Sequence, residues 1–227
     1  MSTESFTAVA NRTPGHVHIV LIATGSVASV KIPLIVKELL QHKRVKIQVV
    51  ATKASQVFFD SARLKAEHGV NIWQDEDEWT ASLSWKKMGD AILHIELRRW
   101  ADLVLIAPCS ANTLAKLAGG LCDNLATSLL RALPPIQTDV EQASLIADRP
   151  GESTRVEVWV FPAMNTLMYE HPLTAMHLKV VKETLKYRVE GPIGKGLACG
   201  DVGLGAMTEW KDIVKMVVDH YRLERSH

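Results

Sequence analysis

Three side chains in this sequence have types and settings suited to chemistry: His94, Asn165 and Cys199. Cys199 lies in 191–205, a segment that holds six of the chain's 13 glycines. Because ordering so many glycines is costly, such a segment is a linker or a lid, and a thiol on a lid could donate a proton or act as a nucleophile. Asn165 follows an apolar run, where its amide could donate to a carboxylate or merely cap a helix. His94 lies on a predicted helix, where a lone histidine is more often a packed or interface residue than a catalyst.

Two further segments have the composition of loops that hold a phosphate or a planar ring. The segment 24–27, TGSV, separates a strand-like run from a helix-like one. Backbone N–H groups at such a helix start bind phosphate, and glycine permits close approach, although an ordinary tight turn has the same composition. Thr52 and Ser55 could add hydroxyl donors to the same anion or simply cap a helix. The small polar residues of 107–113, APCSANT, could lie flat against a ring or begin a helix.

The overall composition is that of an ordinary globular protein. Hydrophobic residues make up 47% of the 227 residues and charged residues 22%, which allows one sizeable core. The formal net charge of +1 argues against a nucleic-acid binder, which normally carries a basic face. Cys109, Cys122 and Cys199 form no CxxC pair, and the histidine spacings predict no metal site. Free thiols favour a reducing compartment, and no apolar run reaches the roughly 18 residues that span a bilayer, so we expect a cytoplasmic protein without membrane contact.

Strand-like and helix-like segments alternate along the chain. The strand-like runs are 16–23, 45–51, 102–107 and 156–161. They are apolar throughout rather than alternating, which indicates strands buried on both faces. Asp90 and Asp123 are candidate caps for two of the intervening helices. This order predicts an α/β fold with a doubly wound parallel sheet in a single domain, where ligands bind beyond the carboxyl ends of the strands.

Three stretches fall outside this alternation. Residues 1–15 are polar and lack the apolar core of a signal peptide, so we expect a flexible N-terminal tail before a domain of residues 16–223. Residues 133–155 combine three prolines with several acids and little periodicity, which indicates a mobile surface insertion. We interpret the glycine-rich 191–205 as a substrate lid.

Three longer strings carry a resemblance to a known family. They are LHIELRRWADLVLIAPCSANTLAKLAGGLCDNL (93–125), PAMNTLMYEHP (162–172) and LACGDVGLGAM (197–207). Together they resemble the phosphopantothenoylcysteine decarboxylases, which belong to the flavin-containing cysteine decarboxylases. The resemblance covers roughly residues 16–222, with all the motifs in order.

The resemblance implies a Rossmann-like, flavodoxin-like fold that binds FMN and forms a homotrimer with active sites at subunit interfaces. The implied reaction converts 4′-phosphopantothenoylcysteine to 4′-phosphopantetheine in coenzyme A biosynthesis. FMN oxidises the substrate thiol to a thioaldehyde, carbon dioxide is lost from this activated species, and the enethiol is then reduced again.

The same resemblance assigns the site residues. It implies that His94 is the active-site histidine and that Cys199 is the proton-donating cysteine of the lid. It implies that Asn165 grips the substrate carboxylate, with Met168 and Ala198 also contacting the substrate. The implied FMN contacts are Gly25, Ser26, Val27, Thr52, Ser55, Ser110, Ala111, Asn112, Thr113 and Ala163.

Other functions stay open at this point. Some fungal relatives of this family inhibit a protein phosphatase or act as non-catalytic members of a mixed trimer, and such proteins often lack one catalytic residue and carry long acidic tails. This sequence has His94, Asn165 and Cys199 together and no acidic tail, which favours the enzyme. A peptidyl-cysteine decarboxylase is a second alternative, which the LACG string disfavours. A flavin prenyltransferase is a third, and its flavin loop and lid should differ from those of this sequence.

Overall fold

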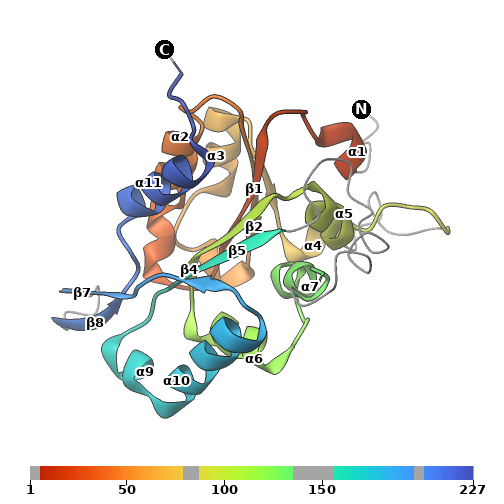
Figure 1. The fold of residues 1–227 in the computed structure, drawn as a ribbon. Coiled ribbons are helices and arrows are strands. Elements are labelled where there is room, and N and C mark those ends of the chain that lie inside the picture. Colours follow the sequence, from red (N-terminus) through yellow and green to blue (C-terminus); the bar gives the residue numbers. More distant parts are fainter. Residues whose placement is uncertain (1–5, 79–86, 135–155, 197–201, 227) are drawn as a thin grey trace.

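Six parallel strands form the main sheet of the computed structural model, which describes residues 6–78, 87–134, 156–196 and 202–226 (Figure 1). In spatial order the strands are β3 (Asn71–Trp73), β2 (Val45–Ala51), β1 (Val17–Ala23), β4 (Leu103–Cys109), β5 (Glu157–Pro162) and β6 (Arg188–Val189). The order descends from β3 to β1 and continues at β4, so the direction of winding reverses between β1 and β4. Loops diverge at such a point and leave a crevice for a ligand. The doubly wound α/β fold is therefore confirmed.

The sheet is buried on both faces because its side chains alternate between two apolar cores. On β1, Ile19 and Leu21 belong to one core, whereas Val20 and Ile22 belong to the other. All four side chains are completely buried. This two-sided burial is what uninterrupted apolar strands predict.

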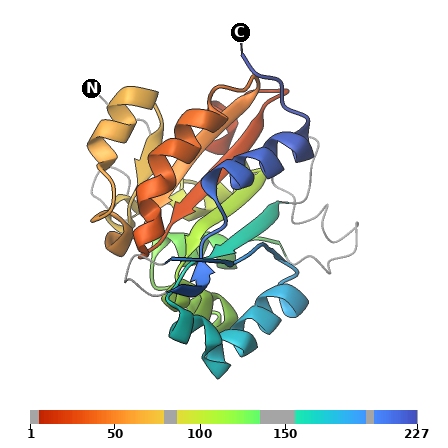
Figure 2. The same cartoon turned by 90° about the vertical axis from the view of Figure 1, so that its left-hand side faces the viewer.

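Helices from distant parts of the sequence cover the two faces (Figures 1 and 2). The first core is covered by α2 (Ile32–Leu39), α3 (Ser61–His68) and α11 (Trp210–Tyr221). The second is covered by α5 (Leu93–Trp100), α6 (Ala111–Gly119) and α7 (Leu125–Arg131). The remaining helical segments are α1 (Ala8–Asn11), α4 (Asp75–Glu78), α9 (Thr166–Glu170), α10 (Pro172–Lys179), η1 (Val27–Lys31), η2 (Lys53–Ser55) and η3 (Val180–Thr184).

A separate antiparallel pair, β7 (Ile193–Gly196) and β8 (Val202–Ala206), forms the base of the predicted lid. The residues between these strands, 197–201, lie outside the described residues, and Ala198 and Cys199 are among them. Residues 135–155 of the predicted surface insertion also lie outside the described residues.

The N-terminal segment packs against the domain, so the expectation of a loose tail over residues 1–15 is wrong for residues 6–15. Phe6 is buried, with its ring centroid 5.4 Å from that of Trp73 and 6.3 Å from that of Trp100. Arg12 donates hydrogen bonds to the Trp100 carbonyl (2.6 Å) and to Asp102 Oδ1 (3.0 Å). These partners of Phe6 and Arg12 lie more than 60 residues away in the sequence, where a local pattern gives no sign of them.

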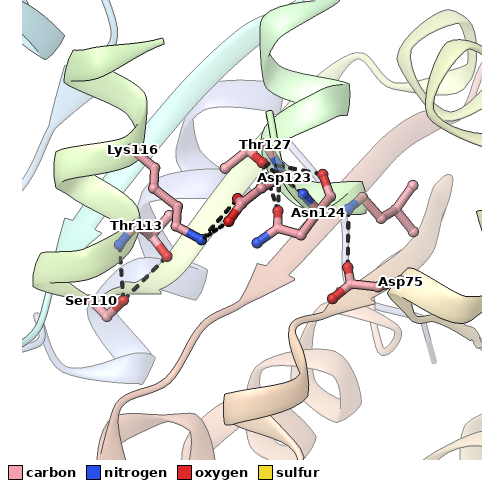
Figure 3. Close-up of polar contacts among 8 residues, drawn as sticks. Asp75, Ser110, Thr113, Lys116, Asp123, Asn124 and Thr127 are labelled. Carbon is pink, nitrogen blue, oxygen red and sulfur yellow. Dashed lines mark hydrogen bonds and ion pairs between the residues drawn. The ribbon is translucent and has the colours of Figure 1, made fainter. Parts of the chain in front are cut away.

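Two predicted helix caps are also wrong. Asp90 accepts a hydrogen bond from the Lys87 N–H (2.9 Å), whereas α5 begins at Leu93, with Ile92 before it. Asp123 pairs with the Lys116 ammonium, and the next residue, Asn124, caps α7 by accepting from the Thr127 N–H at 2.8 Å (Figure 3). In each case a charged or backbone donor nearby competes successfully for the carboxylate.

Candidate functional site

Thr24 joins the two loops that diverge at the reversal point of the sheet. This residue follows β1, and its hydroxyl donates to the carbonyl of Pro108 in β4 (2.8 Å). The same oxygen accepts a hydrogen bond from the Ser110 N–H (2.8 Å). Thr24 is completely buried, so these bonds are shielded from water and fix the spacing of the two loops.

Gly25 lies where the first loop passes close to the turn after β2. A methyl group at Gly25 would lie 2.7 Å from Ala54 Cβ, closer than carbon atoms pack. Glycine is therefore required here by the close approach of two backbones. Beside Ala54, the Ser55 hydroxyl donates to the Thr52 carbonyl (2.7 Å), whereas Thr52 Oγ1 is buried without a hydrogen-bond partner. A buried hydroxyl without a partner is uncommon in folded proteins, and this one lies directly after β2 rather than in the lining of the neighbouring cavity.

The loop after β4 continues directly into α6, and Ser110 caps that helix. Its Oγ accepts a hydrogen bond from the Thr113 N–H (3.2 Å) and lies 3.2 Å from Thr113 Oγ1, to which it donates (Figure 3). Thr113 is buried and its hydroxyl is occupied within the cap. The small side chain of Ala111 and the amide of Asn112, in the first turn of α6, are left to line the adjacent space.

Asn165 ends the loop after β5 and caps α9. Its side-chain oxygen accepts a hydrogen bond from the Met168 N–H (2.8 Å), which directs the amide oxygen to the helix and leaves the amide N–H₂ as a free donor group. Strand β8 lies against this corner, since the Met164 N–H donates to the Gly205 carbonyl (3.0 Å). Gly205 has a φ of +150°, and a methyl group there would lie 2.3 Å from the Met164 carbonyl oxygen, so only glycine fits.

These loops surround a cavity of about 660 Å³ at the carboxyl ends of β1, β4 and β5. This volume lies within the range of small-molecule and cofactor sites. The predicted site residues that line it are Gly25, Ser26, Val27, Ser110, Ala111, Asn112, Ala163, Asn165 and Met168. Thr52, Ser55, Thr113 and His94 are not among its lining residues.

Other lining residues are not evident from the sequence. They include Lys31, Phe58 and the segment 206–210, which runs from β8 into α11. The sequence pattern predicts Trp210, at the start of α11, only as one apolar position of an amphipathic helix. Its position beside the cavity depends on how β8 returns to the sheet. In the sequence, the glycine-rich segment 191–205 just before residues 206–210 is the feature that could have indicated this part of the cavity lining.

His94 lies on the opposite face of the sheet from α2 and α11, in the first turn of α5. Its Nδ1 is 2.6 Å from Glu78 Oε1, and its side chain is 21% exposed. His94 is not among the residues of this chain that line the cavity beside Asn165. Cys199 is outside the described residues.

The buried thiol of Cys109 and the metal-ligating side chains of the described residues form no second site. Burial raises the pKa of the Cys109 thiol to about 12, which keeps it protonated and unreactive at neutral pH. Among the described residues, no group of three or more His, Cys, Asp and Glu side chains could hold a metal ion. In the same part of the chain, no helix is long and apolar enough to cross a membrane.

Comparison with known proteins identifies the family. The model of the Flavoprotein family matches residues 8–222. The chain is 44% identical to a phosphopantothenoylcysteine decarboxylase of Arabidopsis thaliana over 88% of this chain and 82% of that protein. The chain belongs to the phosphopantothenoylcysteine decarboxylase family of flavoproteins.

Solved structures of relatives have the same fold. HAL3 from Cryptococcus neoformans is 46% identical, with a TM-score of 0.73 over 92% of this chain and 97% of that one. A cysteine-to-serine variant of a PPC decarboxylase, complexed with pantothenoylaminoethenethiol, is 40% identical, with a TM-score of 0.73 over 91% and 99%.

The relatives differ in length. This chain spans 30% of a probable thymidylate synthase of Schizosaccharomyces pombe and 33% of coenzyme A biosynthesis protein 3 of Saccharomyces cerevisiae, whereas the match covers 88–92% of this chain. The family domain is thus found both as most of a protein and as about a third of a longer one.

The residues of the cavity fit a flavin, the group that gives the family its name. Ala111 and Ala163 present small side chains beside which a flat ring can lie, and Gly25 lets the backbone approach a ligand closely. Ser110 and Asn112 add uncharged polar side chains to the same lining. A flavin phosphate needs such uncharged donors together with backbone N–H groups.

Proposed function

We propose that this chain binds FMN in the cavity at the carboxyl ends of β1, β4 and β5 and decarboxylates 4′-phosphopantothenoylcysteine to 4′-phosphopantetheine. The observation that carries the proposal is Asn165, whose amide N–H₂ borders the same cavity as the loops that fit FMN. A carboxylate in the cavity could accept a hydrogen bond from that group, and the bond would align the substrate. Bound FMN supplies the two-electron acceptor and donor that oxidation and re-reduction of such a substrate require.

In this proposal Asn165 orients the substrate, because its oxygen is held by the Met168 N–H and its nitrogen is thereby directed outward. Met168, 47% exposed, provides an apolar contact beside it, and Ala198 adds another from the lid. Cys199 donates the proton that accompanies the final reduction of the enethiol. His94 takes the proton of the substrate thiol at its Nε2 atom.

We further propose that the active site forms between subunits of a homotrimer, because His94 of this chain is not among the residues that line the cavity. Large apolar side chains are exposed around the cavity and on the neighbouring helices, including Val27 (49%), Leu173 (52%) and Met176 (61%). Such a gathering is typical of a surface that another subunit covers. A neighbouring copy seated there would present its His94 to the cavity.

Complementation between two inactive variants tests this arrangement. His94→Asn and Asn165→Asp are each expected to be inactive alone. If His94 and Asn165 of one site come from different subunits, random co-assembly restores about one quarter of the sites, since each site needs two independent intact contributors. Co-expressed and co-purified variants that stay inactive, with wild-type oligomers confirmed by light scattering, would contradict the shared site.

The regulatory alternative is tested in the same preparation. HAL3 from Cryptococcus neoformans is among the similar structures, and a phosphatase-inhibiting or partner role in a mixed trimer needs no turnover. Decarboxylation by the purified chain alone supports the enzyme, whereas phosphatase inhibition without product supports the alternative. We also propose a cytoplasmic location, since Cys109 and Cys122 are both free thiols.

A further inference from the structure

We infer that Glu78 is a positioning residue for His94, which it holds in the tautomer that leaves Nε2 free to accept a proton. The inference rests on the proposed function, because that function makes His94 an active-site residue. Its structural basis is the contact of 2.6 Å between Glu78 Oε1 and His94 Nδ1.

The contact determines which ring nitrogen carries the hydrogen. An ionised carboxylate can only accept hydrogen bonds, so Nδ1–H of His94 donates to Glu78 Oε1. In the neutral imidazole the other nitrogen, Nε2, is then an unprotonated acceptor. When Nε2 takes the proton of a substrate thiol, the products are a thiolate and an imidazolium, and the carboxylate stabilises the positive charge that has formed.

The carboxylate of this pair is shielded from water. The Glu78 side chain is only 3% exposed, and its second oxygen, Oε2, is buried without a hydrogen-bond partner among the described residues. Little water therefore competes with His94 for the carboxylate, and the interaction is screened less than one at the surface. A buried carboxylate with one unpaired oxygen is costly to fold, which points to a use other than stability.

The surrounding helices hold Glu78 in place. It ends α4, whose first residue, Asp75, accepts a hydrogen bond from the Leu125 N–H (3.0 Å) at the start of α7 (Figure 3). Partial burial is the main cause that raises the Asp75 pKa, and the hydrogen bond from Leu125 acts in the opposite direction. Helix α4 contacts α7 as well as α5, so the element that carries Glu78 is held beside the element that carries His94.

The test combines an NMR measurement with kinetics on the FMN-saturated full chain. Long-range ¹H–¹⁵N spectra of ¹⁵N-histidine-labelled protein report the tautomer, and the His94 signals are assigned by their loss in His94→Asn. The wild type is expected to show hydrogen at Nδ1. Glu78→Ala and Glu78→Gln are expected to shift the population toward hydrogen at Nε2 and to lower kcat by about 10- to 100-fold, with KM changed less than about twofold.

The matched control is Glu96→Gln. Glu96 is a second buried carboxylate, on α5 itself, that accepts from the Ala8 N–H (2.7 Å) and pairs with Arg99. This variant is expected to keep the His94 tautomer and a kcat within about twofold of wild type. An equal kcat loss in the control would mean that general disturbance of α5 is the cause, which would overturn the inference.

The remaining outcomes are also distinguishable. An unchanged tautomer in Glu78→Ala, or a changed tautomer with wild-type kcat, refutes the positioning role. A wild-type chain without decarboxylase activity refutes the proposed function instead, and the NMR spectra still decide whether Glu78 sets the tautomer of His94.

Discussion

Replacement of Asp102 by asparagine tests the packing of the N-terminal segment at the amino edge of the sheet. Asp102 accepts hydrogen bonds from the His18 N–H (2.9 Å), from His18 Nδ1 (2.9 Å) and from Arg12 (3.0 Å). The His18 side chain is 1% exposed, and its Nε2 accepts from the Thr13 N–H (3.0 Å), which assigns the ring hydrogen to Nδ1. An asparagine has one acceptor oxygen in place of two, so at least one buried donor loses its partner.

The expected loss follows from that unpaired donor and the lost charge. Breaking a buried ion pair from one side costs about 3 kcal/mol or somewhat more. For a chain of this size, such a loss lowers Tm by about 6–12 °C. The matched control is Asp123→Asn, which removes the Lys116 pair at a 54% exposed carboxylate and is expected to cost less than about 1 kcal/mol.

The pH dependence of the stability gives a second check on the role of Asp102. Burial acts to raise the Asp102 pKa, but hydrogen bonds from His18 and Arg12 outweigh it, so the pKa is lowered. A carboxyl group with a lowered folded-state pKa stabilises the protein above its unfolded-state pKa of about 3.9, and this contribution is lost as the pH falls through the folded-state value. The difference in Tm between wild type and Asp102→Asn should therefore be largest at neutral pH and should shrink below about pH 4.

The assay is thermal unfolding followed by circular dichroism, at fixed protein and FMN concentrations because both bind the folded state. A Tm for Asp102→Asn within 2 °C of wild type at pH 7 would refute the reasoning, as would a difference that grows toward acid pH.

Three further predictions concern the proposed site. Gly25→Ala places a methyl group 2.7 Å from Ala54 Cβ, so FMN affinity measured by flavin fluorescence titration should fall at least about tenfold, and an unchanged Kd would contradict the close-approach argument. Asn165→Asp keeps a good helix cap for the Met168 N–H but replaces the amide donor by a negative charge; Tm should change by less than about 3 °C while kcat/KM falls at least about 100-fold, and retained kcat/KM would remove Asn165 from substrate binding. Cys199→Ser should still release carbon dioxide but accumulate the unreduced enethiol, as read by mass spectrometry, and full pantetheine production by this variant would refute its role as proton donor.

Much of the fold is predictable from local sequence because its signals are local. The apolar runs around Ile19 and Leu105 predict buried parallel strands, and Gly25 marks the tight turn after the first of them. Side chains that immediately follow a strand, such as Ser110 and Asn165, are placed at the carboxyl edge of the sheet by topology alone, which is why they meet in the cavity.

The rest depends on contacts between distant segments. Phe6 and Arg12 lie in a polar stretch, and only the folded domain supplies the tryptophan rings and the carboxylate that hold them. Trp210 enters the cavity wall because β8 returns along Met164, a pairing that no spacing in the sequence reveals. Glu78 is one of four consecutive acidic residues in α4, and nothing in the sequence separates it from the other three, although it is the one that contacts His94.

The separation of His94 from the cavity has a different cause. The sequence brings His94, Asn165 and Cys199 together only as family motifs. In the folded chain the first turn of α5 carries His94 to Glu78, whereas the first turn of α6 carries Asn112 to the cavity. A site that is completed by a second subunit cannot be derived from strand order or spacing within a single chain.

The most direct test of the account is to incubate the purified, FMN-loaded chain with 4′-phosphopantothenoylcysteine and to follow the product by mass spectrometry. We expect this chain to form 4′-phosphopantetheine without a partner protein, with one carbon dioxide released for each product molecule. A flavin-saturated protein that leaves the substrate unchanged would contradict it.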